Sequence, residues 1–175
     1  MIVLGIDSGT TETGWVVWDN SKKAIVPATF FAKVPQFKNR PKLMGKDNNN
    51  QLIRFILPVI FETHVVEVVG IEMFAGYGRS VGRSTFDACR WVGRFEELCL
   101  TSNLPVTLVY RKMDVCPWIC RTVKAKDKDI RAALIKMYGI PGTKKKPGAL
   151  YGMANDMWSA LAIAVTTVEK YHAKT

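Results

Sequence analysis

The chain has 175 residues, with 25 Lys and Arg against 15 Asp and Glu, which gives a formal net charge of +10. This length suits one domain with a sizeable core and leaves little room for a second, so residues 1–175 are expected to form a single domain. No apolar run reaches the ~20 residues of a membrane-spanning helix, and the strong positive charge favours a polyanion such as nucleic acid as the partner.

The sequence also bears on the cellular compartment. The chain opens directly with a strand-like run over residues 1–7, so no signal peptide is expected and a cytoplasmic location is predicted. The four cysteines show no paired C-x-x-C pattern and are interpreted as reduced packing residues: Cys89, Cys99, Cys116 and Cys120.

Hydrophobic periodicity and turn residues predict the secondary structure. The expected elements, in chain order, are strands over 1–7, 14–19 and 24–34, a helix over 51–63, a strand over 65–72, a helix over 84–101, a strand over 105–110, and helices over 127–137 and 151–172. Residues 35–50 are polar and predicted to be a loop, and Pro58 is expected to disturb the first helix. This order predicts an α/β fold in which helices flank a five-stranded mixed sheet.

Two predicted strands end in an acid that follows a glycine by two residues, in Gly5-Ile6-Asp7 and Gly70-Ile71-Glu72. Side chains alternate between the faces of a strand, so each acid shares a face with its glycine, and the glycine is expected to leave space there for a ligand or metal. If the strands are parallel neighbours, the two carboxylates lie side by side and repel each other. A divalent cation such as Mg²⁺ is the usual way to keep such a pair ionised.

A third acid, Asp156, lies in the last predicted helix. Asp156, Ala160, Ile163 and Thr167 fall on one helical stripe, so Asp156 is expected in the first turn on the face that packs against the sheet. A buried acid there is costly without a partner. Each acid alone has a structural explanation, since helix N-terminal Asp is common. Three acids on two strand ends and a packed helix instead predict a catalytic centre.

These residues carry a family resemblance. Gly5-Ile6-Asp7-Ser8-Gly9 with Thr13-Gly14-Trp15, then Ile71-Glu72, then Asp156 with Ala160-Leu161-Ala162-Ile163-Ala164, resemble the RuvC family of Holliday junction resolvases, and most closely its phage and prophage members. The resemblance spans nearly the whole chain in the same order. It implies an RNase H-like fold, a homodimer and metal-dependent cleavage of four-way DNA junctions, in the bacterial host cytoplasm if the protein is phage-encoded.

The resemblance also implies site residues. Asp7 would bridge two Mg²⁺ ions, or Mn²⁺ as a substitute, with Glu72 on one ion and Asp156 on the other. RuvC proteins usually carry a further acid three residues after the one on the last helix, where this chain has Ser159. The fourth ligand is then missing, supplied by water or Asn155, or replaced from elsewhere, for which Asp127 and Asp129 are candidates.

Basic and aromatic residues near these acids are predicted to hold DNA, mainly through phosphate charge and with little sequence readout. The aromatic candidates follow Glu72 and correspond loosely to a stacking phenylalanine of the RuvC family. The full set is Phe74, Tyr77, Arg79, Arg83, Arg111, Lys112, Lys124, Lys126, Lys128, Lys144, Lys145 and Lys146. A solvated loop explains the run of three lysines equally well, and core packing explains the aromatics.

Three alternatives stay open. The first motif is also similar to the phosphate loop of the sugar kinase, actin and heat-shock ATPase superfamily, although those proteins use two lobes and this chain has room for one. A nuclease of the same fold could act on a flap, a fork or an RNA–DNA hybrid. A catalytically inactive junction-binding module is the third alternative, which Ser159 supports.

Overall fold

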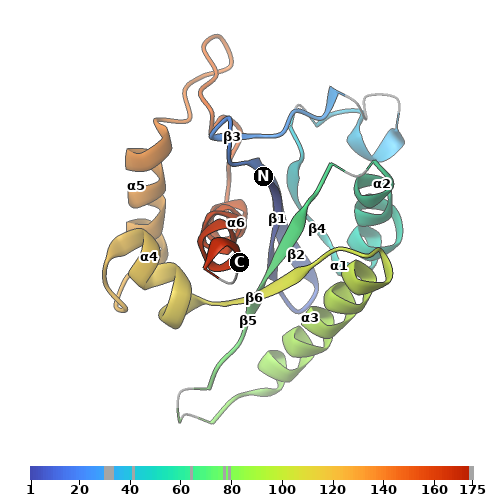
Figure 1. The fold of residues 1–175 in the computed structure, drawn as a ribbon, viewed down its shortest axis with the longest axis vertical. Helices are drawn as coiled ribbons and strands as arrows, with labels where there is room; N and C mark the ends of the chain where they lie inside the picture. Colours follow the sequence, from blue (N-terminus) through green and yellow to red (C-terminus); the bar gives the residue numbers. More distant parts are fainter. Residues whose placement is uncertain (30–33, 41, 64, 77, 79, 174–175) are drawn as a thin grey trace.

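A six-stranded mixed sheet forms the centre of the computed structural model, which describes residues 1–29, 34–40, 42–63, 65–76, 78 and 80–173 (Figure 1). The strands are β1 (Ile2–Ser8), β2 (Glu12–Asp19), β3 (Ala24–Ile25), β4 (Met44–Asn48), β5 (Val68–Met73) and β6 (Val106–Tyr110). Their order is β3-β2-β1-β5-β6, and β4 pairs with β2 along the same edge as β3. Strands β1 and β2 are antiparallel, whereas β1, β5 and β6 are parallel.

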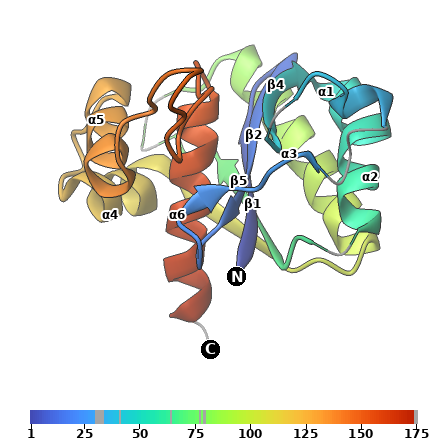
Figure 2. The same cartoon turned by 90° about the horizontal axis from the view of Figure 1, so that it is seen from above.

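Helices cover both faces of this sheet (Figures 1 and 2). One face carries α4 (Cys116–Cys120), α5 (Asp127–Tyr138) and α6 (Met157–His172), and the other carries α1 (Asn49–Gln51), α2 (Leu57–Glu62) and α3 (Arg83–Thr101). Each layer has its own hydrophobic core, because odd-numbered and even-numbered residues of a strand face opposite sides. The predicted α/β class with helices flanking a mixed sheet is confirmed. Among the described helices, none is both long and apolar enough to cross a bilayer.

The strand count differs from the predicted five because the segment over 35–50 is not all loop. Residues Met44–Asn48 form β4, and a short 3₁₀ helix occupies Pro35–Phe37. The strand predicted over 24–34 is shorter than expected: β3 covers only Ala24–Ile25, followed by an isolated bridge at Pro27. Proline lacks the N–H group that a ladder needs, which explains why the strand does not continue. Residues 30–33 of this prediction lie outside the described residues.

The helix boundaries also differ from the prediction. A π-helical segment, Leu52–Ile56, precedes Pro58 in the helical stretch over 49–62, which confirms that the proline disturbs this helix. The segment after β6, for which no element was predicted, is helical in Arg111–Val115 and in α4. Helix α6 starts at Met157 rather than at residue 151, so that Asp156 is its N-cap residue.

Glycines on three neighbouring strands form the surface on which α6 lies. A Cβ atom on Gly5 would lie 2.8 Å from the backbone nitrogen of Ala164, and one on Gly14 would lie 2.7 Å from the carbonyl oxygen of Asp156. Gly70, the β5 neighbour of Gly5, faces the same helix. The expectation that Gly5 and Gly70 leave space for a ligand is therefore wrong: the backbone of α6 fills that space at Gly5, and the side chains of Thr167 and Ile163 fill it at Gly70.

Replacing Gly5 with alanine is expected to lower the free energy of unfolding by about 3 kcal/mol, because the new methyl group meets helix backbone that has no room to move. Urea unfolding followed by circular dichroism measures the change. Gly93→Ala is the matched control: it lies mid-helix in α3 with open space around its Cβ position, so it should gain up to ~1 kcal/mol. Equal effects of the two substitutions would contradict the close approach of α6.

Candidate active site

Asp7 and Glu72 lie side by side at the carboxyl ends of two adjacent strands. The parallel register pairs Ile6 of β1 with Ile71 of β5, so the next residue on each strand is an acid, as the sequence predicted. Burial raises the pKa of Asp7 well above its ordinary value, and so do a hydrogen bond shared with Glu72 and the negative charges of Glu72 and Asp156. Asp7 is thus a buried carboxyl group whose ionisation is opposed by the carboxyl group beside it.

The third acid approaches this pair from above β2. Gly14 is the register partner of Asp7 on β2, and the backbone of Asp156 packs directly over Gly14. The Asp156 side chain is 43% exposed, so the expectation of a buried acid in the first helical turn is wrong. It makes no capping hydrogen bond to its own helix, which leaves its carboxylate available to other partners.

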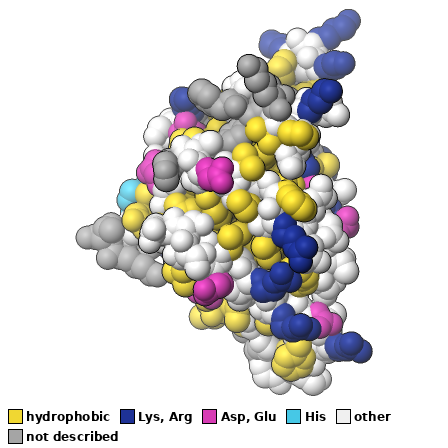
Figure 3. All heavy atoms as spheres, turned by 90° about the vertical axis from the view of Figure 1, so that its right-hand side faces the viewer, with side chains coloured by type: hydrophobic (Ala, Val, Ile, Leu, Met, Phe, Trp, Pro, Cys, Tyr) yellow, Lys and Arg dark blue, Asp and Glu magenta, His cyan; other side chains and the backbone are white. Residues whose placement is uncertain are grey.

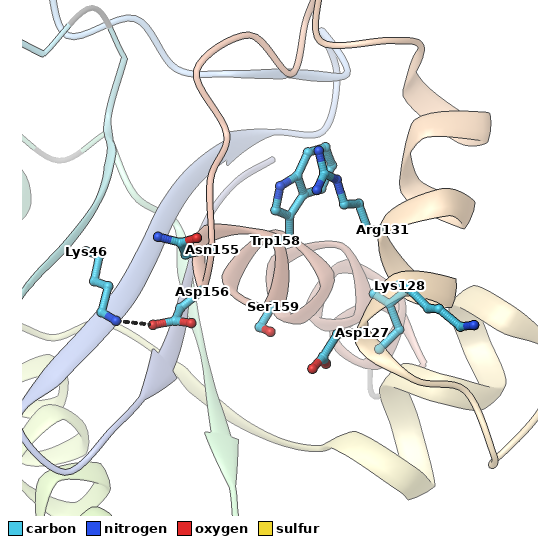
Figure 4. Close-up of a pocket in the computed structure, with 9 residues that line it drawn as sticks. Lys46, Asp127, Lys128, Arg131, Asn155, Asp156, Trp158 and Ser159 are labelled. Carbon is cyan, nitrogen blue, oxygen red and sulfur yellow. Dashed lines mark ion pairs between the residues drawn. The ribbon is translucent and has the colours of Figure 1, made fainter.

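That carboxylate is held by a lysine from the unpredicted strand. Lys46 on β4 is the register partner of Gly14, and its Nζ lies 2.9 Å from Oδ2 of Asp156 and 3.4 Å from Oε2 of Glu12 (Figure 4). Hydrogen bonding and attraction to Asp156, with a smaller contribution from Glu12, raise the pKa of Lys46. Within the described residues, no three acidic, histidine or cysteine side chains converge as a ready-made metal site. Asp156 points toward Lys46 instead of completing such a group.

A second basic residue approaches the acids from β6. Arg111, predicted to contact DNA, forms an ion pair with Asp127 and is also attracted by the negative charge of Glu72. Burial lowers the pKa of Arg111, but the charges of Asp127 and Glu72 outweigh it and the net shift is upward. Of the two acids suggested as a replacement ligand, Asp127 is paired with Arg111, and Asp129 accepts a hydrogen bond from the Lys126 backbone nitrogen at 2.9 Å.

A cavity of about 560 Å³ opens beside Asp156, between α5 and α6. Figure 4 shows Asp127 of α5 facing Ser159 of α6 within it. Its lining residues are Lys46, Asp127, Lys128, Ile130, Arg131, Asn155, Asp156, Trp158 and Ser159. Asp156 belongs to the acidic centre, which is the group of Asp7, Glu72 and Asp156. The cavity is therefore bordered by this carboxylate, by that of Asp127 and by three basic side chains that suit a phosphate group.

The predicted DNA-binding residues divide into three groups. Arg111, Lys112 and Lys124 line a second cavity of about 410 Å³, and Lys126, the N-cap residue of α5, and Lys128 lie at the start of that helix, near the acids. The exposed loop with Lys144, Lys145 and Lys146 projects at the top of Figure 1, away from the carboxyl end of β5, so the structure does not bring it to the acids. Phe74 is partly buried against the core on the α3 side. Tyr77 and Arg79 lie outside the described residues.

Arg90 and Arg94 on α3 form a basic surface with Arg83 that the sequence interpretation missed. The three arginines line a cavity of about 480 Å³ together with Thr10, Thr11, Ser84, Asp87 and Trp91. Basic side chains gather over this part of the molecule in Figure 3. The sequence already contained this pattern, because Arg83, Arg90 and Arg94 are spaced by seven and four residues, which places them on one face of a helix.

The high pKa of Asp7 leads to a prediction for metal-free protein. A carboxyl group whose pKa is raised by folding destabilises the fold as pH rises from its ordinary value through the folded value. Asp7→Asn should therefore raise the free energy of unfolding at pH 7.5 by about 1 kcal/mol, a usual size for one stabilising substitution, and the gain should shrink toward pH 4. Denaturant unfolding in EDTA tests this. Asp156→Asn, which removes the partner of Lys46, should give no gain at either pH.

Comparison of the sequence with protein-family models gave no match, and comparison with curated proteins gave none either. Solved structures do match. The structure of Thermus thermophilus RuvC superposes with a TM-score of 0.68 at 17% identity, covering 100% of this chain and 98% of that one. The same protein in complex with a Holliday junction substrate gives 0.67 at 15% identity, with 99% and 96% covered.

A third structure, the yeast mitochondrial Holliday junction resolvase, gives a TM-score of 0.56 at 15% identity and covers 94% of this chain and 76% of that one. At these identities the likeness concerns the fold. The chain thus has a RuvC-like fold over its whole length, as the sequence resemblance implied, while its closeness to phage members stays a prediction.

Proposed function

We propose that this protein is a divalent-metal-dependent endonuclease that hydrolyses phosphodiester bonds in branched DNA, with four-way junctions as its substrate. One observation carries the proposal: Asp7, whose carboxyl group is desolvated by burial, lies beside Glu72 and shares a hydrogen bond with it at the end of a RuvC-like sheet. A structural role does not explain this pair, because two adjacent carboxylates destabilise a fold unless a cation or proton joins them.

The donor set fits a hard divalent cation. The groups that meet are carboxylate oxygens, which Mg²⁺ prefers and Mn²⁺ accepts, and the described residues bring no histidine or cysteine ligand set there. Asp7 and Glu72 would hold the ion, with Asp156 at the edge of the site. When bound, such an ion polarises the scissile phosphate and lowers the pKa of the attacking water.

The chain's own residues supply the remaining steps. The basic residues at the start of α5 and after β6 hold phosphates on one side of the acids, and Arg83, Arg90 and Arg94 hold them on the other. Asp7 and Glu72, fixed on rigid strand ends, would hold the ion at one position relative to these phosphates.

The junction substrate rests on the comparison with a RuvC that was solved with a Holliday junction. A homodimer follows from it, because two symmetric nicks in a junction need two active sites. The side chain of Phe86 on α3 is 62% exposed and offers apolar surface for such an assembly.

We further propose that the single domain acts in the cytoplasm, in the bacterial host if the protein is phage-encoded, with its four free thiols reduced.

Substitution of the acids tests the enzyme. Glu72→Gln and Asp156→Asn should each slow junction cleavage in Mg²⁺ by at least ~10³-fold, because each removes a charge that organises the metal site, while junction affinity stays within about threefold. A gel assay on a labelled four-way junction, with matched linear duplex, measures both quantities. Glu62→Gln, an exposed acid at the end of α2, is the control.

The outcomes separate the alternatives. Paired symmetric nicks in the junction by a dimer establish a resolvase, whereas equal cutting of linear duplex would contradict junction specificity. A wild-type protein that binds the junction without cutting it in Mg²⁺ or Mn²⁺ would be a junction-binding module and not an enzyme.

The arginine surface of α3 gives a separate prediction. Arg90→Gln combined with Arg94→Gln should weaken junction binding about tenfold and reduce the slope of log K against log salt by about 2, because each arginine neutralises one phosphate. Fluorescence anisotropy at several salt concentrations measures the slope. Arg54→Gln, on the helical segment before α2, removes one positive charge elsewhere and should leave the slope unaltered. An unchanged slope in the double variant would remove α3 from the DNA path.

A further inference from the structure

Lys46 lies on β4, a strand that the sequence did not predict, and the surrounding residues fix its contact with the acidic centre. Lys46 stands opposite Gly14 on β2, and because Gly14 has no side chain, the Lys46 ammonium group and the Asp156 carboxylate meet above it at 2.9 Å. The Glu12 carboxylate, two residues before Gly14 on the same face, holds the ammonium group from the other side at 3.4 Å.

The strand that carries Lys46 is anchored from its opposite face. Asp47, the next residue, is 8% exposed and accepts a hydrogen bond from Nε1 of Trp15 at 2.7 Å and one from Arg40. Asn49, which follows the strand, accepts a hydrogen bond from the Thr13 hydroxyl at 2.7 Å. These buried contacts fix the register of β4 on β2 and thereby the position from which Lys46 reaches the centre.

The ligands of the centre suit one divalent ion, held between Asp7 and Glu72. A second ion would need the Asp156 carboxylate, but Oδ2 of Asp156 lies 2.9 Å from the Lys46 ammonium group, so a positive charge already stands there. The fourth acid that would support a second ion is absent, because Ser159 faces this cavity one turn after Asp156.

We propose that Lys46 is a catalytic residue that takes the place of a second metal ion, so that this chain binds one divalent cation between Asp7 and Glu72 and uses the Lys46 ammonium group beside Asp156 to stabilise the leaving oxygen. The inference rests on the proposed nuclease function. The Lys46 side chain is 35% exposed and lines the cavity next to Asp156, so a phosphate can reach it.

The reaction balances without a further reagent. A water oxygen bonds to phosphorus, the bond from phosphorus to the 3′-oxygen breaks, and its electron pair stays on that oxygen. The 3′-oxygen then takes up, through solvent, the proton that the water has lost. Lys46 keeps its proton throughout and contributes a fixed positive charge where negative charge develops, which avoids the cost of reorganising solvent.

The test counts ions and measures rates in the same proteins. Mn²⁺ binding to the purified full chain, followed by electron paramagnetic resonance of the free ion, is expected to show one ion per chain. Single-turnover junction cleavage should rise with Mn²⁺ as a one-site curve. Lys46→Met should still bind one ion but cut about 10²-fold more slowly, the usual loss for one preorganised donor, with junction affinity within about threefold. Lys46→Arg, which keeps the charge, should recover most of the rate.

A compensating variant makes the test specific. Lys46→Met combined with Ser159→Asp removes the ammonium group and adds a carboxylate one helical turn after Asp156, so it should bind a second Mn²⁺ ion and recover cleavage. Lys22→Met, the same change at an 80% exposed lysine beyond the far end of β2, should match wild type in ion count and rate.

Two tightly bound Mn²⁺ ions in the wild-type centre, or wild-type cleavage by Lys46→Met, would overturn the role of Lys46. A wild-type protein that cuts junctions with two ions leaves the proposed function standing and removes only this inference. A wild-type protein that neither binds Mn²⁺ nor cuts DNA contradicts the proposed function itself.

Discussion

The close approach of α6 to the sheet is the constraint on which the acidic centre depends. Gly5, Gly14 and Gly70 remove side chains from three adjacent strands, so the backbone of the chain over 156–164 rests on the sheet at Gly5 and Gly14, and Thr167 and Ile163 pack onto Gly70. Larger side chains at these positions would hold the helix further from the sheet, and Asp156 would not stand over the strand that neighbours Asp7. The glycines thus place a helix terminus and two strand ends in one small volume.

Electrostatic conflict follows from that placement. Burial and the neighbouring acids raise the pKa of Asp7, which means that the folded chain holds a carboxyl group where it is unstable as an anion. Basic residues from opposite sides compensate part of this negative charge. Lys46 on β4 forms an ion pair with Asp156, and Arg111, at the end of β6, is attracted by Glu72. Charge in this region is distributed among four strands and two helices, so the centre requires the whole sheet and cannot be reduced to a local motif.

What the sequence could predict follows from the range of the interactions concerned. Strand alternation and the repeated glycine-to-acid spacing placed each acid on the face of its glycine, because both patterns act within one strand. The position of Asp7 beside Glu72 depended on the parallel pairing of β1 with β5, which the sequence left as a condition. Strand β4 was not predicted. Three of its five residues are polar, and Trp15 and Arg40 hold it in place by satisfying a buried Asp47, a contact that no local propensity encodes.

Other differences had visible causes in the sequence. Pro27 already marked the end of β3, since it cannot donate to a ladder. The delayed start of α6 makes Asp156 a cap residue, because Gly152 and Asn155 just before it have positive φ angles, which a right-handed helix does not contain.

The placement of charge around the acids bears on the proposal that this molecule acts on branched DNA. Basic cavities lie on both sides of the centre: one at α3, and the others where β6 leads into α4 and α5. Phosphate contacts carry almost no sequence information, so selectivity has to come from which backbone geometry can engage both sides at once. A straight duplex presents its phosphates along one direction and is stiff over the length of a protein this size. Two arms that diverge from a branch point can lie on the two basic surfaces separately while their strands meet at the acids. Because the branch already changes the direction of the DNA, binding requires no further free energy to bend it.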